Sequence, residues 1–455
     1  MTEAFSSNIA HKIKIRYGRE LALGLICACI LVCISGNALR AQLILGPKEE
    51  IPKSVIKPGK PLVEVKKVST GRVIHRFHDT SPLSPSGRYM ALFRLPFEDR
   101  YPQAGDAGEV ILVDMKTGIE KVVAVSRGWE MQVGANVQWG SSDEELYYND
   151  VDTKNWEAFA VQLNPLTGKS RRMEGTVFMS SLDGKELISY NLINSIHAQS
   201  GYGVILPDSL TDYNIGPVAT DGIYVTETRT GKTRRLVTIK DIYENTKPSI
   251  KVENPMDFAY YCFKIMWNPQ HTRIMTLVQW TPLTGGKRKI AVITMDPDGS
   301  NMHTAVTPEQ YARGGHHMAW TADGDHISMN LEVDGKPGLE LITVRYDGKN
   351  LKTVFPTGSG HPSFHPGGLP FIITDSYLKE PVTKGDGFVP VRLLNTETGE
   401  EHLIASVFVP NVKDNSFRVD PHPAWDRTGR YVIFNGYEDN TRCVYIADLQ
   451  NILLP

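Results

Sequence analysis

A strand that ends in a tight turn and is followed by a returning strand recurs seven times along this chain of 455 residues. The turns are rich in Pro, Gly, Asn, Asp and Ser, the residues that tight turns favour. They lie at residues 84–87, 141–143, 182–184, 268–270, 322–324, 366–368 and 426–429. A repeat of this kind predicts a series of similar structural units.

The two ends of the chain complement each other. Six of the turns are followed by a second hairpin with Thr-Gly or Asp-Gly at its tip, whereas the seventh unit has only one further strand, at residues 444–449. The missing partner is at the other end, where residues 62–77 form a hairpin of the same type. A closed ring of four-stranded blades needs this arrangement, because it leaves no open edge. The sequence therefore predicts an all-β, seven-bladed β-propeller over residues 62–455, with the N-terminal strand closing the last blade.

The N-terminal region predicts export. Residues 1–20 carry four of the basic residues, and residues 21–35 are an apolar run of a length typical of a signal peptide, with cleavage near Ala38 or Ala41. The alternative is an uncleaved membrane anchor, with residues 21–35 as the tether, although this run is short for a bilayer span. Both interpretations of residues 1–41 place the protein in the periplasm or on a membrane facing it. Residues 42–61 show no periodicity and are predicted to be a linker.

Composition excludes one class of partner. The formal net charge is −2, so no basic excess is available to neutralise the phosphates of a nucleic acid. Of the five cysteines, only Cys262 and Cys443 lie in the body of the chain, and no Cys-x-x-Cys motif is present. We expect these two to be small buried side chains.

Three histidines occupy one repeated position. His317, His361 and His422 each stand three residues before the aromatic residue that precedes the turn. The first strand of each propeller blade lines the central channel, so we expect the three side chains to converge from neighbouring blades. The equivalent position holds Lys264 in one earlier unit and Asn136 in another. The channel is therefore predicted to be polar.

Side-chain alternation puts Asp420 on the same face as His422. Three neutral imidazoles and one carboxylate suit a divalent transition metal, such as manganese, iron, nickel or zinc, with positions left open for water or substrate. The alternative is that the histidines bond to backbone carbonyls and cap the blade turns. By the same alternation His316 should point away from the axis, and His365 should lie at a turn in a structural role.

Two motifs carry a resemblance to known families. The Asp-Gly hairpins resemble those of TolB-type propellers, and His-x-x-Trp-x-x-Asp-Gly at residues 317–324, with Pro-His-Pro-x-aromatic at residues 421–425, is similar to the oligogalacturonate lyases. Those enzymes are seven-bladed propellers that hold manganese at the ring centre and cleave uronate-containing oligosaccharides by β-elimination. The resemblance implies that His317 and His422 are metal ligands. The chain departs from the family at two positions, where Asp420 replaces the first histidine of a His-Pro-His motif and Phe417 replaces a glutamine.

The same resemblance suggests catalytic roles. Lys264 corresponds most nearly to the family's catalytic histidine, and a lysine acts as a base when its surroundings lower its pKa. Arg313 or Arg418 would hold the substrate carboxylate. His78, with Asp79 to orient it, is an alternative acid–base residue.

A different class of function remains open. Many propellers of this type bind a protein or glycan partner in the periplasm without catalysis, and the fold alone does not choose between the two classes. A hydrolase or peptidase is not favoured, because no Gly-x-Ser-x-Gly motif is present.

Overall fold

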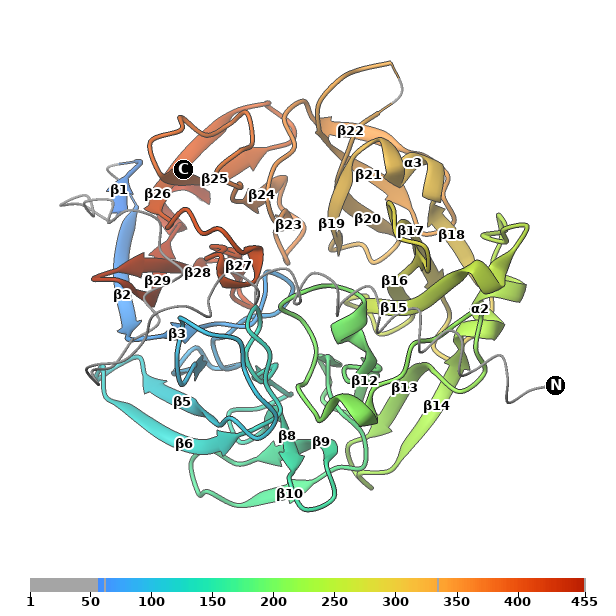
Figure 1. Cartoon of the computed structure of the whole chain (residues 1–455). Helices are drawn as coiled ribbons and strands as arrows, with labels where there is room; N and C mark the ends of the chain where they lie inside the picture. Colours follow the sequence, from blue (N-terminus) through green and yellow to red (C-terminus); the bar gives the residue numbers. More distant parts are fainter. Residues whose placement is uncertain (1–55, 61–62, 334, 454–455) are drawn as a thin grey trace, which may run out of the picture. The chain divides into compact units, whose positions relative to one another are not determined.

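The computed structural model describes residues 56–60, 63–333 and 335–453. Within these residues, 29 strands form seven antiparallel sheets that follow one another around a ring in chain order (Figure 1). The predicted all-β, seven-bladed propeller is confirmed. The expectations for residues 1–41 lie outside the described residues. No helix among the described residues is long and apolar enough to cross a membrane.

Each of the first four blades is built from four consecutive strands, the first of which lies at the inner edge. Blade 1 contains β3 (Val73–Ile74), β4 (Tyr89–Arg94), β5 (Gly108–Asp114) and β6 (Glu120–Ser126). Blade 2 contains β7 (Gln138–Trp139), β8 (Leu146–Asp152), β9 (Glu157–Leu163) and β10 (Ser170–Arg172). Blade 3 contains β11 (Met179–Ser180), β12 (Glu186–Tyr190), β13 (Gly222–Glu227) and β14 (Thr233–Thr238). Blade 4 contains β15 (Phe258–Trp267), β16 (Ile274–Pro282), β17 (Lys289–Met295) and β18 (His303–Val306).

The last three blades include two strands from the start of the described chain. Blade 5 contains β19 (Gly315–Trp320), β20 (His326–Leu331), β21 (Glu340–Arg345) and β22 (Lys352–Phe355). Blade 6 contains β23 (Ser363–Phe364), β24 (Phe371–Thr374), β25 (Phe388–Asn395), β26 (Glu401–Phe408) and, outermost, β1 (Ile56–Pro58). Blade 7 contains β27 (Ala424–Trp425), β28 (Tyr431–Glu438), β29 (Thr441–Asp448) and β2 (Glu64–Thr70).

The ring closes as the sequence predicts. Strand β2 pairs antiparallel with β29 from Glu64 opposite Asp448 to Thr70 opposite Cys443, and Figure 1 shows these two ends of the described chain side by side. Strand β1 falls in the segment expected to be a linker and adds a fifth strand to blade 6. A three-residue segment has too little periodicity to be recognised as a strand, so this pairing was not predictable.

Short helices connect the blades. Helix α2 (Ile239–Asn245) begins with a capping box between Thr238 and Asp241, and α3 (Pro308–Arg313) begins with one between Thr307 and Gln310. Helix α4 (Gln450–Leu453) follows the last strand. The connections also contain the 3₁₀ helices η1 (Asn194–His197), η2 (Asp208–Leu210), η3 (Pro255–Asp257) and η4 (Asn415–Phe417).

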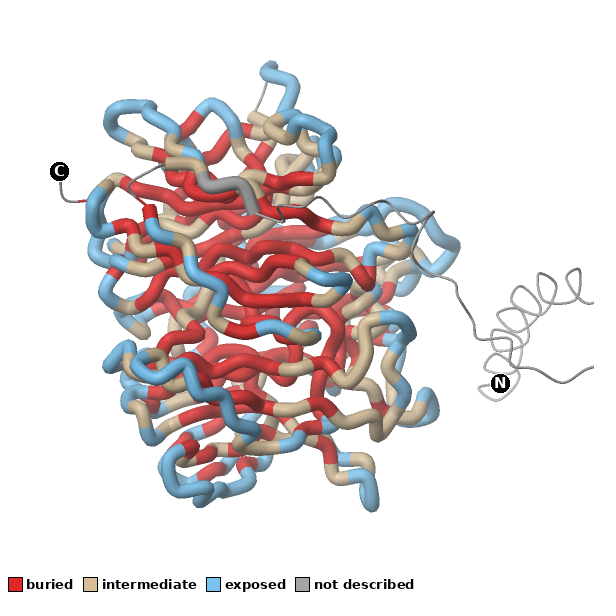
Figure 2. Tube along the Cα trace, turned by 90° about the vertical axis from the view of Figure 1, so that its left-hand side faces the viewer, coloured by how far each residue is buried: buried red, intermediate tan, exposed pale blue. Residues whose placement is uncertain are grey.

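Tryptophans of the repeat join neighbouring blades. The indole N–H of Trp139 donates to the carbonyl of Pro82 at 2.9 Å, and that of Trp425 donates to the carbonyl of Ser363 at 3.0 Å. In each case the acceptor belongs to the preceding blade. Most of the blade strands are buried, and the exposed segments are mainly turns and outer edges (Figure 2). Repeated packing of this kind holds the inner strands in register around the axis.

The long insertion in blade 3, residues 191–216, reaches across one end of the axis. Ser200 Oγ lies 2.7 Å from Ser416 Oγ, in the loop that leads into blade 7. The backbone N–H of Gly203 donates to Glu130, in the loop that leads into blade 2. Arg288 of the connection between β16 and β17 donates to the carbonyl of Ala198 at 3.1 Å. The insertion therefore covers part of the channel mouth.

Candidate metal centre

Four channel positions share an uncommon backbone conformation. The residues three before a repeat tryptophan have φ values of 54° at Asn136, 52° at Lys264, 53° at His317 and 48° at His422. Left-handed φ is uncommon outside glycine and costs about 1–3 kcal/mol per residue, and it clusters at functional sites. In β15 and β19 the pairing register shifts at this position, which identifies a β-bulge.

The bulge brings two adjacent histidines together. Nδ1 of His316 lies 2.8 Å from Nδ1 of His317. The expectation that His316 points away from the axis is therefore wrong, because a residue with left-handed φ interrupts the alternation of an extended strand.

His317, His361 and His422 meet at the axis from blades 5, 6 and 7. The ring centroids of His317 and His361 are 3.9 Å apart, and those of His361 and His422 are 4.2 Å apart. His361 and His422 are each 1% exposed. The three histidines, which occupy equivalent positions in the repeat, are therefore neighbours in the folded structure.

Asp375 orients His361. Nδ1 of His361 lies 2.9 and 3.0 Å from the two carboxylate oxygens. The carboxylate also accepts the backbone N–H groups of His361 at 2.7 Å and His422 at 3.0 Å. Burial raises the pKa of Asp375, whereas these N–H donors favour the ionised form. Because both oxygens accept hydrogen bonds, Nδ1 carries the imidazole proton and Nε2 of His361 is left with a lone pair.

His317 is held in the same tautomer. Its Nδ1 lies 2.8 Å from the carbonyl oxygen of Gly360, which can only accept. Nδ1 therefore carries the proton, and Nε2 has a lone pair. Nε2 of His316 lies 3.3 Å from a carboxylate oxygen of Glu380. His316 therefore connects His317 to Glu380.

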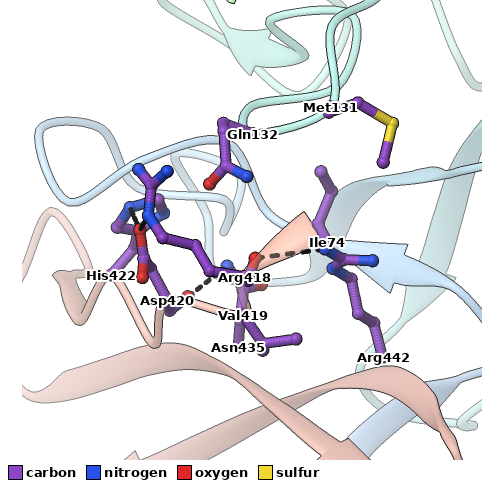
Figure 3. Close-up of a pocket in the computed structure, with 9 residues that line it drawn as sticks. All are labelled: Ile74, Met131, Gln132, Arg418, Val419, Asp420, His422, Asn435 and Arg442. Atoms are coloured by element: carbon purple, nitrogen blue, oxygen red, sulfur yellow. Dashed lines mark hydrogen bonds and ion pairs between the residues drawn. The ribbon is translucent and has the colours of Figure 1, made fainter. Parts of the chain in front are cut away.

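Asp420 and His422 complete the cluster. Ligand atoms of His361, Asp420 and His422 all lie within 4.8 Å of one another. Burial alone would raise the pKa of Asp420, but the charge of Arg418 and the bond from its Nε at 2.6 Å lower it to about 2. Figure 3 shows Arg418 and Asp420 beside His422, at the edge of a small pocket also lined by Gln132. The carboxylate is therefore ionised at neutral pH.

The donor set fits a divalent cation. Burial lowers the pKa of His317, His361 and His422, so all three are neutral and available as ligands. Among the described residues, neither ring nitrogen of His422 has a hydrogen-bond partner, although both are buried. Nε2 of His422 lies 3.6 Å from Asp420. Buried polar atoms are normally satisfied, and a bound ion would satisfy the one ring nitrogen of His422 that has a lone pair.

The channel is not wholly polar, contrary to expectation. The ring of Phe77 from blade 1 lies 4.6 Å from that of His422 and 5.6 Å from that of His361. Phe77 is 1% exposed. No sequence pattern indicates this contact, because Phe77 lies outside the repeated histidine position. The phenyl ring makes one wall of the histidine cluster apolar.

Lys264 lies over the face of the Phe77 ring. Its Nζ is 4.0 Å from the Phe77 centroid and 5.7 Å from the ring centroid of Tyr202. Burial, together with the charges of Arg418 and Arg76, lowers the pKa of Lys264 to about 7, against the opposing charges of Asp79 and Asp420. A buried amine with a pKa near neutrality can accept a proton at physiological pH.

The pairing of His78 with Asp79 was predicted incorrectly. Asp79 is bonded to Arg76, and neither ring nitrogen of His78 has a hydrogen-bond partner among the described residues. The His78 ring lies 5.5 Å from His361, so it does belong to the cluster. Burial and the nearby Lys264 lower its pKa well below the usual range, so His78 is neutral and is not a general acid at physiological pH.

The two arginines differ in position. Arg418 borders the cluster, and its side chain is 17% exposed. Its Nη1 donates to the carbonyl of Asn415 at 2.9 Å, and its Nη2 lies 3.4 Å from the hydroxyl of Tyr202. Arg313 is the exposed last residue of α3.

A cavity of about 400 Å³ lies at the turn end of the axis and is lined by residues of all seven blades. Its aromatic lining comes from the repeat itself, at Trp139, Trp267, Trp320, Phe364 and Trp425. His78 lies on its wall and thus separates this cavity from the histidine cluster.

Fold and site together define a seven-bladed β-propeller with neutral histidines and an ionised carboxylate on its axis. The sequence matches no protein-family model and no curated protein. Among solved structures, the chain is similar to oligogalacturonate lyase from Vibrio parahaemolyticus, with a TM-score of 0.57 and 13% identity over 88% of this chain and 97% of that one. It is equally similar to an oligogalacturonate lyase in complex with manganese, with a TM-score of 0.56 and 14% identity over 88% and 99% of the two chains. A putative TolB from Agrobacterium tumefaciens aligns with a TM-score of 0.38 and 13% identity over 75% and 97%. At 13% and 14% identity, the likeness to the two lyases shows the fold alone.

Proposed function

We propose that the protein is a metal-dependent lyase that cleaves uronate-containing oligosaccharides by β-elimination. One observation carries the proposal. His317 and His361 each keep the imidazole proton on Nδ1, so two Nε2 lone pairs face the axis beside His422 and an ionised Asp420. The proposed ion is divalent, and manganese is favoured by the similarity to a lyase that was solved with manganese.

The reaction needs an acidified proton and a base. β-Elimination removes the proton from C5 of the uronate, breaks the bond from C4 to the bridging oxygen and leaves a double bond between C4 and C5. When bound, the ion would supply a Lewis acid toward the uronate carboxylate. Lys264 would accept the C5 proton, because its amine is partly unprotonated near pH 7.

Arg418 is better placed than Arg313 to hold the substrate carboxylate. Its guanidinium lies at the partly exposed edge of the cluster, next to Asp420. Nε and Nη1 donate to Asp420 and to the carbonyl of Asn415, whereas Nη2 makes the longer contact of 3.4 Å with the Tyr202 hydroxyl, so Nη2 is the group that would turn to the substrate. We assign no proton transfer to His78, because Asp79 is bonded to Arg76 and does not orient the imidazole.

The predicted N-terminal signal, or tether, supports a further part of the proposal, that the protein acts in the periplasm. A uronate-containing oligosaccharide would meet the enzyme in that compartment.

The test combines two measurements on protein purified without a histidine tag. Mass spectrometry would give the metal content, and ultraviolet absorbance would follow formation of the unsaturated product from pectic and other uronate oligosaccharides. Stoichiometric metal with rising absorbance would establish the lyase. Metal without product from any uronate would overturn the reaction but keep the metal centre. A metal-free protein that takes up no added manganese would favour the alternative, a non-catalytic propeller that binds a protein or glycan.

A further inference from the structure

Tyr377 faces the two histidine lone pairs. It follows β24 of blade 6, and its hydroxyl lies 3.3 Å from Nε2 of His317 and 3.3 Å from Nε2 of His361. Its backbone N–H donates to Glu380 at 2.8 Å, and the same carboxylate accepts the N–H of Gly360. The residue is therefore fixed by the same loop that positions His361.

Tyr377 cannot donate a hydrogen bond to both histidines. Nδ1 carries the proton in both histidines, so both Nε2 atoms are acceptors. The phenol of Tyr377 has one proton and can satisfy only one of them. The second lone pair is left without a donor in a site that is largely buried, which is unfavourable. The contacts of 3.3 Å are also long for O–H···N bonds.

The same distances suit a coordination shell. With metal–ligand bonds of about 2.1 Å, neighbouring ligand atoms are about 3.4 Å apart in a tetrahedral shell and about 3.0 Å apart in an octahedral one. The separation of the Tyr377 oxygen from each Nε2 lies between these values. A cation between the Tyr377 oxygen and the two Nε2 atoms would bind a lone pair of each, so no acceptor would be left unsatisfied.

We propose that Tyr377 is itself a metal ligand, through its phenol oxygen, together with His317 and His361. The inference rests on the metal centre of the proposed function and extends it to a residue that the sequence resemblance did not indicate. His361 also belongs to the group with Asp420 and His422, so it links Tyr377 and His317 to those two residues. An oxygen ligand of this kind suits manganese and iron.

Coordination of the ion by a phenolate oxygen releases one proton. The O–H bond of Tyr377 breaks, an oxygen–metal bond forms, and one proton passes to solvent for each ion bound. Phenolate bound to Fe(III) gives a charge-transfer band in the visible region, which imidazole and carboxylate ligands do not produce.

The test uses Fe(III) as a probe on the metal-free full-length protein. We expect one ion per chain, a visible charge-transfer band and phenolate vibrations in resonance Raman spectra. Tyr377→Phe should lose the band and bind Mn(II) about 10–100-fold more weakly. Tyr202→Phe is the matched control, because that hydroxyl lies near Arg418 and should leave the band unchanged.

The outcomes separate the two claims. A bound ion without a band in the wild type, or a band that persists in Tyr377→Phe, would overturn the role of Tyr377 and leave the metal centre standing. Failure of Fe(III) and Mn(II) to bind at all would overturn the metal centre and this inference with it. If Tyr377→Phe does not fold, proton release on Mn(II) binding by the wild type decides: about one proton per ion supports a phenolate ligand, and none excludes it.

Discussion

Asp375 and His361 form a buried pair in which the imidazole Nδ1 lies 2.9 and 3.0 Å from the two carboxylate oxygens. Asp375 is fully buried and His361 is 1% exposed, and the same carboxylate accepts the backbone N–H of His422 in the next blade. One side chain thus fixes the tautomer of one proposed ligand and the backbone of another. Loss of the Asp375 carboxylate should therefore weaken metal binding.

Asp375→Asn should weaken Mn(II) binding by about 10–100-fold, because an amide leaves the His361 tautomer poorly defined. Calorimetric titration of the metal-free proteins measures this. Thermal unfolding of the same samples shows whether each is folded at the titration temperature. Equal affinity in the folded variant would mean that Asp375 does not act through His361.

His422→Ala should abolish retention of metal through purification. The substitution removes a neutral imidazole whose two nitrogens have no other partner among the described residues. His326→Ala is the control, since His326 lies on β20 and pairs with Asp323 instead of facing the axis. Mass spectrometry of the purified proteins should find metal in the wild type and in His326→Ala. Retained metal in His422→Ala would contradict the proposed ligand set.

Elimination should speed up as the pH rises through about 7, because Lys264 must be unprotonated to act as the base and its pKa is lowered to about 7. Lys264→Arg cannot lose its proton near neutrality and should reduce kcat by about 10²–10⁴-fold while metal content stays unchanged. Profiles of kcat/KM against pH for both proteins check this. A full rate in Lys264→Arg, with the same ascending limb, would assign the base elsewhere.

Glu130 should make the fold less stable as the pH rises from 4.5 to about 7. Burial raises its pKa from 4.5 to about 7, although Gly203 N–H and Asn136 bond to it. The folded state therefore holds a proton that the unfolded state has lost, and this contribution disappears as the pH passes the folded pKa. Glu130→Gln removes the effect. Urea unfolding should show the variant gaining stability relative to the wild type between pH 5 and pH 8, whereas the exposed Glu253→Gln should show no such change.

Removing residues 1–71 should destabilise blade 7, because β2 then no longer pairs with β29 along residues 443–448. The exposed edge of β29 would invite association between chains. Light scattering and thermal unfolding of the truncated protein measure both effects. Removal of residues 1–55, which keeps β1 and β2, is the control. A truncated protein that associates no more than the control and is equally stable would show that closure by β2 is dispensable.

The propeller could be predicted because a short sequence pattern, a strand followed by a tight turn, recurs along the chain. The turn at Asp323–Gly324 and the strand before it need only the chemistry of neighbouring residues, and the same pattern returns around the ring. The complementary ends required β2 to join β29, because a ring has no free edge. The repeat also places His317 and His422 at equivalent positions, because each stands at the same distance from its turn.

The tertiary structure alone decided what surrounds those histidines. Asp375, Tyr377, Glu380 and Phe77 have no repeated position, and they reach the axis from loops whose paths depend on packing. His316 faces the cluster because of the left-handed φ at His317, a conformation that sequence periodicity does not reveal. Tautomers, buried pairs and the lowered pKa of Lys264 arise from contacts between blades distant in the chain. The sequence by itself thus determined the ring and the residues at its repeated positions, and only the folded structure determined their protonation and partners, because burial and distance exist only in three dimensions.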